Sequence, residues 1–242
     1  MVESAYGTEW RAVFWDIGGV ILDSGSVRRA HEAFVRTIVE RYAPEASVED
    51  ALARWRAAVG TYFRERDGTE FRRARTAYDR AVDEISGEPI PEDEWRPVFE
   101  SVTTETLRPN PGAVEAIERL ATETGIHVGV VSDVDTEEGK RILETFGVRE
   151  RFDSITTSEM VGRTKPDPRM FETGLRAADV PPSDAAMIGD RYEHDVAGAS
   201  AVGMTAIGYG AEEGPETDYA IDDLREVLSI VGVEERGETD GN

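Results

Sequence analysis

The sequence predicts an α/β protein with a doubly wound parallel sheet and an inserted, all-helical cap. Short continuous apolar runs alternate with segments of helical periodicity over most of the chain, which is typical of parallel strands covered on both faces. The alternation is interrupted by one long block that has only helical spacing. We expect a core of residues 1–25 and 108–231, a helical cap of residues 26–107 and an acidic, solvated tail of residues 232–242.

The expected strands are short apolar runs bounded by turn residues or by helical segments. The first is Ala12–Trp15, which ends at Asp16 and the turn residues Gly18 and Gly19. The other expected strands lie at about residues 127–131, 154–157, 185–188 and 204–207. Helices are expected between them, at about residues 113–122, 137–145, 169–178 and 196–202.

The block of residues 26–107 is rich in Ala, Arg and Glu and shows apolar residues at helical spacing, as in Phe34, Ile38 and Tyr42. We expect about four helices and no strand in it. Because the block follows the first strand, it should lie over the carboxyl ends of the strands, where open α/β sheets bind ligands. It is therefore expected to act as a lid.

Four polar residues follow apolar strands or stand at a helix entrance on the same edge of the expected sheet. They are Asp16, Ser132, Lys165 and Asp190. In a parallel sheet these side chains converge on one crevice. Carboxylates, a hydroxyl and an ammonium suit a phosphate ester together with a hard divalent cation, because Mg²⁺ takes oxygen ligands and shares phosphate oxygens with its carboxylates.

The segments that carry these residues resemble the four motifs of the haloacid dehalogenase-like superfamily. They read Phe-Trp-Asp-Ile-Gly-Gly-Val at 14–20, Val-Val-Ser-Asp at 130–133, Lys-Pro-Asp-Pro at 165–168, and Gly-Asp-Arg-Tyr-Glu-His-Asp at 189–195. All four occur in the family's order over residues 13–204, which is most of the chain.

The resemblance implies a hydrolase of the phosphatase-like branch, in which Asp16 attacks phosphorus and forms an aspartyl phosphate. It also implies Mg²⁺ as cofactor, held by Asp16, Asp190 and the carbonyl of Gly18 and supported by Asp195. Catalysis by such a site consists mostly of positioning and charge neutralisation.

The phosphate group has its own implied binding residues. The resemblance assigns Ser132 and Lys165 to the transferring phosphoryl oxygens, with Gly18 and Asp133 beside them. Lys165 would act as a point charge that offsets the repulsion between Asp16 and the phosphate.

One position departs from the family pattern, because Gly18 stands where the phosphatases usually carry a second Asp. That Asp serves as general acid to the leaving oxygen and contributes roughly 10²–10⁴-fold to the rate. Haloacid dehalogenases also lack it, so a 2-haloacid dehalogenase is the first alternative, and a catalytically weakened binding module is the second. Phosphoryl chemistry is favoured because Asp190 and Asp195 would repel a substrate carboxylate unless a cation lay between them. His194 is a further candidate proton donor.

Composition excludes several classes of function. The chain has no cysteine, which rules out disulfides, thiolate nucleophiles and cysteine-bound metal sites. A net charge of -23 repels nucleic acid and anionic membranes. No targeting segment or long apolar stretch is recognisable, so we expect a cytoplasmic protein whose partner is a small phosphorylated metabolite. Nothing in the sequence indicates an oligomeric state.

The charge balance also suggests a salt-loving source. There are 50 acidic against 27 basic residues, and of the basic ones only Lys140 and Lys165 are lysines. Repulsion among so many acids is best tolerated where salt screens it, since the Debye length is about 3 Å at 1 M salt. The alternative is an ordinary acidic protein whose surface charge has no special meaning.

If repulsion among the acids limits stability, the melting temperature should rise between low salt and 1 M or more, because screening removes the repulsion. KCl and NaCl should act similarly at first. Thermal unfolding followed by circular dichroism over this range checks the expectation, and a melting temperature that stays flat or falls contradicts the halophile hypothesis.

Overall fold

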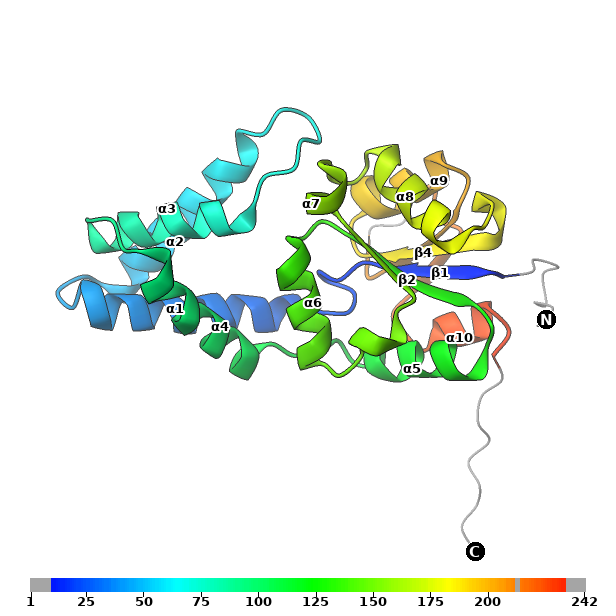
Figure 1. Cartoon of the computed structure of the whole chain (residues 1–242), viewed down its shortest axis with the longest axis horizontal. Helices are drawn as coiled ribbons and strands as arrows, with labels where there is room; N and C mark the ends of the chain where they lie inside the picture. Colours follow the sequence, from blue (N-terminus) through cyan, green and yellow to red (C-terminus); the bar gives the residue numbers. More distant parts are fainter. Residues whose placement is uncertain (1–9, 212–213, 234–242) are drawn as a thin grey trace, which may run out of the picture.

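A six-stranded parallel sheet forms the centre of the computed structural model, which describes residues 10–211 and 214–233 (Figure 1). The strand order is β3-β2-β1-β4-β5-β6. The strands are β1 Ala12–Trp15, β2 His127–Ser132, β3 Ser154–Thr157, β4 Ala185–Gly189, β5 Thr205–Tyr209 and β6 Tyr219–Ile221. The predicted doubly wound α/β fold is therefore confirmed.

The register of the three central strands brings the ends of β1, β2 and β4 together. Trp15 of β1 pairs with Val130 of β2 on one side and with Ile188 of β4 on the other. Asp16 continues this register, since its backbone N–H donates to the carbonyl of Ile188 at 3.0 Å. The loops that follow the three strands therefore begin at one level of the same sheet edge.

Helices cover both faces of the sheet, and successive β1 residues point to opposite faces. Val13 and Trp15 belong to one core cluster and Ala12 and Phe14 to the other. In Figure 1 α5 and α10 lie below the sheet, α6 stands at its left, and α8 and α9 lie above it. The first face carries α5 Ala113–Glu123, α6 Thr136–Thr145 and α10 Glu226–Ile230, and the second carries α8 Pro168–Ala178 and α9 Ala197–Ala201.

The first four helices after β1 extend away from the sheet, on the left of Figure 1. They are α1 Ser24–Tyr42, α2 Val48–Arg64, α3 Ala74–Ser86 and α4 Glu92–Thr106. Their core is aromatic: the ring of Phe34 lies 5.4 Å from Trp55 and 5.2 Å from Phe99. The predicted all-helical insertion is confirmed, and its only β-type contact in the described residues is an isolated bridge between Glu70 and Arg163.

Two chain segments connect the helical insertion to the sheet, and they run side by side. The backbone N–H of Asp23 donates to the carbonyl of Arg108 at 3.0 Å, and that of Asn110 donates to Ile21 at 2.9 Å. The side-chain amide of Asn110 also donates to the carbonyls of Gly19 and Val20, at 2.7 and 2.8 Å. The insertion therefore leaves and re-enters the core at one place, immediately beside the loop after β1.

Some short elements were not expected from the sequence. They are β6, α10 and the single-turn helix α7 Ser158–Val161. β6 has only three residues, of which the middle one is exposed, so it lacks the continuous apolar run that marks the other strands. Of the expected tail, Val233 is buried in the core, and residues 234–242 lie outside the described residues. No helix in the described part of the chain is long and apolar enough to cross a bilayer.

Candidate active site

Asp16 stands at the end of the central strand and is almost fully buried, with 3% of its surface exposed. Its Oδ1 accepts a hydrogen bond of 2.8 Å from the backbone N–H of Ile17. The same N–H lies 3.3 Å from the hydroxyl oxygen of Ser132, at the end of β2. Asp16 and Ser132 thus meet across the edge of the sheet, as expected.

Lys165 brings an ammonium group into the same place and is completely buried. Its Nζ lies 3.1 Å from Asp16 Oδ1 and 2.7 Å from Asp195 Oδ1, and it donates to the carbonyl of Val131 at 3.1 Å. Burial by itself would lower the pKa of Lys165, but the charges of Asp16, Asp195 and Asp133 outweigh it and raise the pKa. The ammonium therefore stays charged.

The four groups expected to converge do so, and Asp195 joins them. Asp16, Asp190 and Asp195 each offer an oxygen, and these three atoms lie within 4.8 Å of one another. Asp190 Oδ1 is buried and has no hydrogen-bond partner among the described residues. A buried carboxylate oxygen without a partner is costly unless a cation binds it. The donor set consists of oxygens alone, so it fits the Mg²⁺ expected from the sequence.

Burial also affects the nucleophile candidate. Desolvation raises the pKa of Asp16 to about 6, although the charge of Lys165 and a hydrogen bond from Ser132 act to lower it. The pKa of Asp190 is raised as well, by burial and by the charge of Asp195. Asp16 remains mostly ionised at pH 7, as a nucleophilic carboxylate must be.

Two glycines make room for the carboxylates. A Cβ at Gly19 would lie 1.9 Å from Asp190 Oδ2, and the backbone of Gly19 has φ +77°, which favours glycine. A Cβ at Gly189 would lie 2.0 Å from the Cβ of Asp195. The sequence marked Gly19 only as a turn residue, and its close approach to Asp190 depends on tertiary structure.

Gly18 differs from Gly19 both in the space around its Cα and in its backbone conformation. A Cβ built on Gly18 meets no atom within 4 Å, and its φ is outside the left-handed region. Neither space nor backbone conformation therefore demands glycine at this position.

Asp133, which was expected beside the phosphate, has a different set of partners. Its Oδ1 accepts from the backbone N–H of Lys165 at 2.8 Å, and its Oδ2 accepts from Arg191 at 2.9 Å. Burial acts to raise the pKa of Asp133, but His194, Lys165 and Arg191 outweigh it and lower the pKa to about 2. The carboxylate thus positions the backbone of Lys165, and repulsion between like charges disfavours its contact with a phosphate.

Arg191 is the site residue that the sequence analysis missed. Besides Asp133, its guanidinium faces Asp195, with Nε 3.9 Å from Asp195 Oδ2, and its side chain is 42% exposed. Its place directly after Asp190 was the available signal. His194 lies on the same side, with Nδ1 3.8 Å from Asp133 Oδ2.

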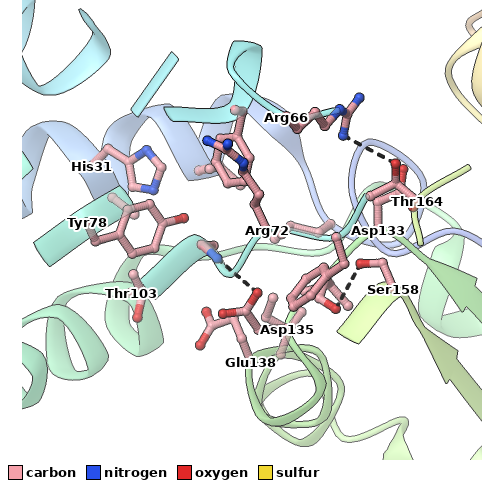
Figure 2. A pocket seen from close by; sticks show the side chains of 18 of the residues that line it. His31, Arg66, Arg72, Tyr78, Thr103, Asp133, Asp135, Glu138, Ser158 and Thr164 are labelled. Atoms are coloured by element: carbon pink, nitrogen blue, oxygen red, sulfur yellow. Dashed lines mark hydrogen bonds between the residues drawn. The ribbon is translucent and has the colours of Figure 1, made fainter. Parts of the chain in front are cut away.

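A cavity of about 750 Å³ separates the helical insertion from the core, a volume typical of small-molecule sites. Figure 2 shows Arg66 and Thr164 at one end of it and His31 with Tyr78 at the other. His31 packs on the rings of Tyr78 and Trp55, and burial lowers its pKa to about 4, so it is neutral. The end with Arg66 and Thr164 adjoins Asp133 and Arg191, which also line the cavity.

Comparison with known proteins gives a consistent family. The model of the haloacid dehalogenase-like hydrolases matches residues 10–203. The chain is 31% identical over 184 residues to ribulose-1,5-bisphosphate 5-phosphatase of Halopiger xanaduensis, covering 69% of this chain and 77% of that protein. It is 28% identical over 204 residues to glyceraldehyde 3-phosphate phosphatase of Methanothermobacter thermautotrophicus, covering 81% and 84%.

A shorter match agrees with this family, and a solved structure has the same fold. Haloacid dehalogenase-like hydrolase domain-containing protein 3 of Bos taurus is 47% identical over 90 residues, which span only 37% of this chain and 36% of the bovine protein. The crystal structure of a HAD phosphatase from Thermococcus onnurineus superposes with a TM-score of 0.69 at 24% identity, covering 93% of this chain and 99% of that one.

Gly19→Ala should lower the affinity for Mg²⁺ by about 10- to 100-fold, because the new methyl group displaces the Asp190 carboxylate. Gly18→Ala is the matched control, since its methyl group meets open space and it keeps the backbone carbonyl. Titration calorimetry on both variants, with folding checked by circular dichroism, measures the difference. Equal affinities would mean that Asp190 does not bind the ion.

Proposed function

This chain belongs to the haloacid dehalogenase-like hydrolases, and we propose that it is a Mg²⁺-dependent phosphatase acting on a small phosphate ester. The observation that carries the proposal is the buried cluster at the end of β1. There one ammonium, from Lys165, lies between the carboxylates of Asp16 and Asp195, while no group of the described chain donates a hydrogen bond to Asp190 Oδ1. Such a cluster retains negative charge for a cation and one fixed positive charge for a phosphoryl oxygen.

In the proposed reaction the free carboxylate oxygen of Asp16 attacks phosphorus. The bond from phosphorus to the leaving oxygen breaks, the leaving oxygen takes a proton from solvent water, and Asp16 becomes an aspartyl phosphate. Water then attacks the same phosphorus, which releases inorganic phosphate and restores the carboxylate. Ser132 and Lys165 bind phosphoryl oxygens in both steps, so that their charge and hydrogen bonds are in place before the reaction begins.

The proposed metal ligands are Asp16, Asp190 and the carbonyl of Gly18, with Asp195 in support. When bound, Mg²⁺ supplies positive charge that offsets the repulsion between Asp16 and the phosphate and favours the ionised carboxylates. Asp195 is also tied to Lys165 and accepts a hydrogen bond of 3.0 Å from the backbone N–H of Arg191. It therefore links the cation side of the site to the phosphate side.

The substrate proposed is a small phosphorylated metabolite that extends into the cavity beneath the cap. The relatives that match most of the chain bear the names of phosphatases of a sugar bisphosphate and of a triose phosphate, which supports this size class. With a net charge of -23 a nucleic-acid or membrane substrate is disfavoured.

A 2-haloacid dehalogenase is the second candidate, and Gly18 is the observation that favours it. Its substrate would bring a carboxylate into a crevice that already holds Asp16, Asp190 and Asp195. Among the described residues the one fully buried cation at that point is Lys165, and it is already shared between two of these acids. The charge balance therefore favours phosphate with a divalent cation.

Phosphate release from para-nitrophenyl phosphate with Mg²⁺ should be lost in Asp16→Asn and in Asp190→Asn, because one removes the nucleophile and the other a metal ligand. Asp93→Asn, on an exposed position of α4, is the matched control and should keep its activity. Full activity in excess chelator, or an active Asp190→Asn variant, contradicts the proposal. Release of halide from 2-haloacids instead would identify a dehalogenase. Turnover of neither substrate would favour a binding module.

Gly18→Asp should raise the turnover of an alkyl phosphate by up to about 10²–10⁴-fold, because it supplies the missing general acid. A Cβ at Gly18 meets no atom of the described residues within 4 Å. The gain should be much smaller for para-nitrophenyl phosphate, whose leaving group needs no proton.

Gly18→Asn is the matched control, since it has the same size but no acidic proton. A folded, Mg²⁺-binding Gly18→Asp variant with unchanged rates on both esters would show that another group, such as His194, already supplies the proton.

A further inference from the structure

The acids that line the cavity already have partners. Asp133 binds the backbone N–H of Lys165 and Arg191. Asp135 accepts hydrogen bonds from the first backbone N–H groups of α3, at 3.0 and 3.4 Å. Glu138 binds Arg141 through both carboxylate oxygens, at 2.6 and 3.0 Å. The negative charges of these three carboxylates are therefore already balanced or hydrogen-bonded within the protein.

The end of α2 and the loop after it contribute three arginines to the cavity. Arg72 is paired with Glu65 at 3.7 Å, whereas the other two have no partner of opposite charge among the described residues. Arg64 and Arg66 both line the cavity, and among the described residues no carboxylate lies within 4.0 Å of either guanidinium. Arg64 is exposed, whereas Arg66 is half-buried. The uncommitted charge of this cavity is thus positive, in a chain whose net charge is -23.

The guanidinium of Arg66 reaches the chain segment that carries Lys165. Its Nη1 donates to the hydroxyl of Thr164 at 3.3 Å, and Thr164 directly precedes Lys165. In Figure 2 the head of Arg66 is directed at Thr164, at the end of the cavity where Asp133 lies. Within the described part of the chain this bond to a neutral hydroxyl is the only one that the Arg66 guanidinium forms, so its other N–H donors are available to a ligand.

Backbone hydrogen bonds fix the loop that carries Arg66 to the core. The N–H of Thr164 donates to the carbonyl of Thr69 at 2.7 Å, and the N–H of Phe71 donates to Gly162 at 3.2 Å. Arg72 closes the loop on itself by donating to the carbonyls of Tyr62 and Glu65, at 2.7 and 2.8 Å. Arg66 is therefore held in place relative to Lys165, without a need for the ligand to order the loop.

We propose that Arg66 binds a second anionic group of the substrate, a carboxylate or a second phosphate, while Lys165 and Ser132 bind the phosphate that is cleaved. This inference rests on the proposed phosphatase function and defines its substrate class. An arginine fork binds either anion through two parallel hydrogen bonds, and partial burial strengthens them. The cavity of about 750 Å³ accommodates a carbon chain between the two anions.

Matched substrates with one and two anions test the proposal. Glycerol 1-phosphate carries only the phosphate, 3-phosphoglycerate adds a carboxylate, and butane-1,4-diol bisphosphate, compared with its monophosphate, adds a second phosphate. With Mg²⁺ the wild type should have the higher kcat/KM for at least one substrate that carries two anionic groups. The pair of substrates that shows this preference identifies the kind of second group. In Arg66→Gln that preference should fall by about 10- to 100-fold, the loss expected for one charged hydrogen-bonded contact. Arg54→Gln, on an exposed face of α2 away from the cavity, should leave the preference unchanged.

Binding separates this inference from the phosphatase proposal. Calorimetry on Asp16→Asn, which lacks the nucleophile, and on Asp16→Asn combined with Arg66→Gln gives Kd values without turnover. Tighter binding of a compound with two anionic groups, if it is lost in the variant that lacks Arg66, supports the assignment. This holds even if the wild type hydrolyses no phosphate ester and the phosphatase proposal fails. Two outcomes overturn the assignment of Arg66. One is that the wild type shows equal binding and equal kcat/KM for substrates with one and with two anionic groups, and the other is a preference that survives in Arg66→Gln.

Discussion

The site depends on one buried ammonium group. Lys165 is fully enclosed, and its Nζ is within 3.1 Å of Asp16 and 2.7 Å of Asp195. Removing one partner of such a buried ion pair typically costs about 3–5 kcal/mol, so the lysine and the two acids stabilise one another's placement. The ends of three separate chain segments are brought together by this contact, and the geometry of the crevice follows from it.

The surroundings of Lys165 explain why several neighbours have roles other than direct chemistry. Asp133 holds the backbone of Lys165, Arg191 holds Asp133, and Gly19 leaves space for Asp190. Each of these contacts keeps a charged group in position before any ligand binds. Because preorganised charge is more effective than charge that must reorganise, such supporting contacts are part of how the site would work.

Much of the core was predictable because its strands are buried on both faces and therefore appear as uninterrupted apolar runs. The convergence of Asp16, Ser132, Lys165 and Asp190 followed from parallel strands ending at one edge. The strand β6 was not predictable, since it is short and partly exposed.

The supporting contacts were not predictable either, for a different reason. The need for glycine at position 19 arises from Asp190, far away in sequence, and the partners of Asp133 arise from the fold of two other loops. Arg66 lies in a loop without periodicity, so nothing in its local sequence distinguishes it from the other arginines. Such pairings exist only once the chain has folded.

The way the helical insertion joins the core has a consequence for how such a protein can change over evolutionary time. The backbones of Asp23 and Arg108, at the two ends of the insertion, are hydrogen-bonded at 3.0 Å. This contact does not depend on how much chain lies between the two residues. The hydrogen bonds at the base of the insertion therefore do not involve its distal part, which can change without altering them. Asn110 secures the same place, because its amide binds the carbonyls of Gly19 and Val20. The residues with which the insertion lines the cavity can thus diverge while that one side chain holds the loop beside Asp16.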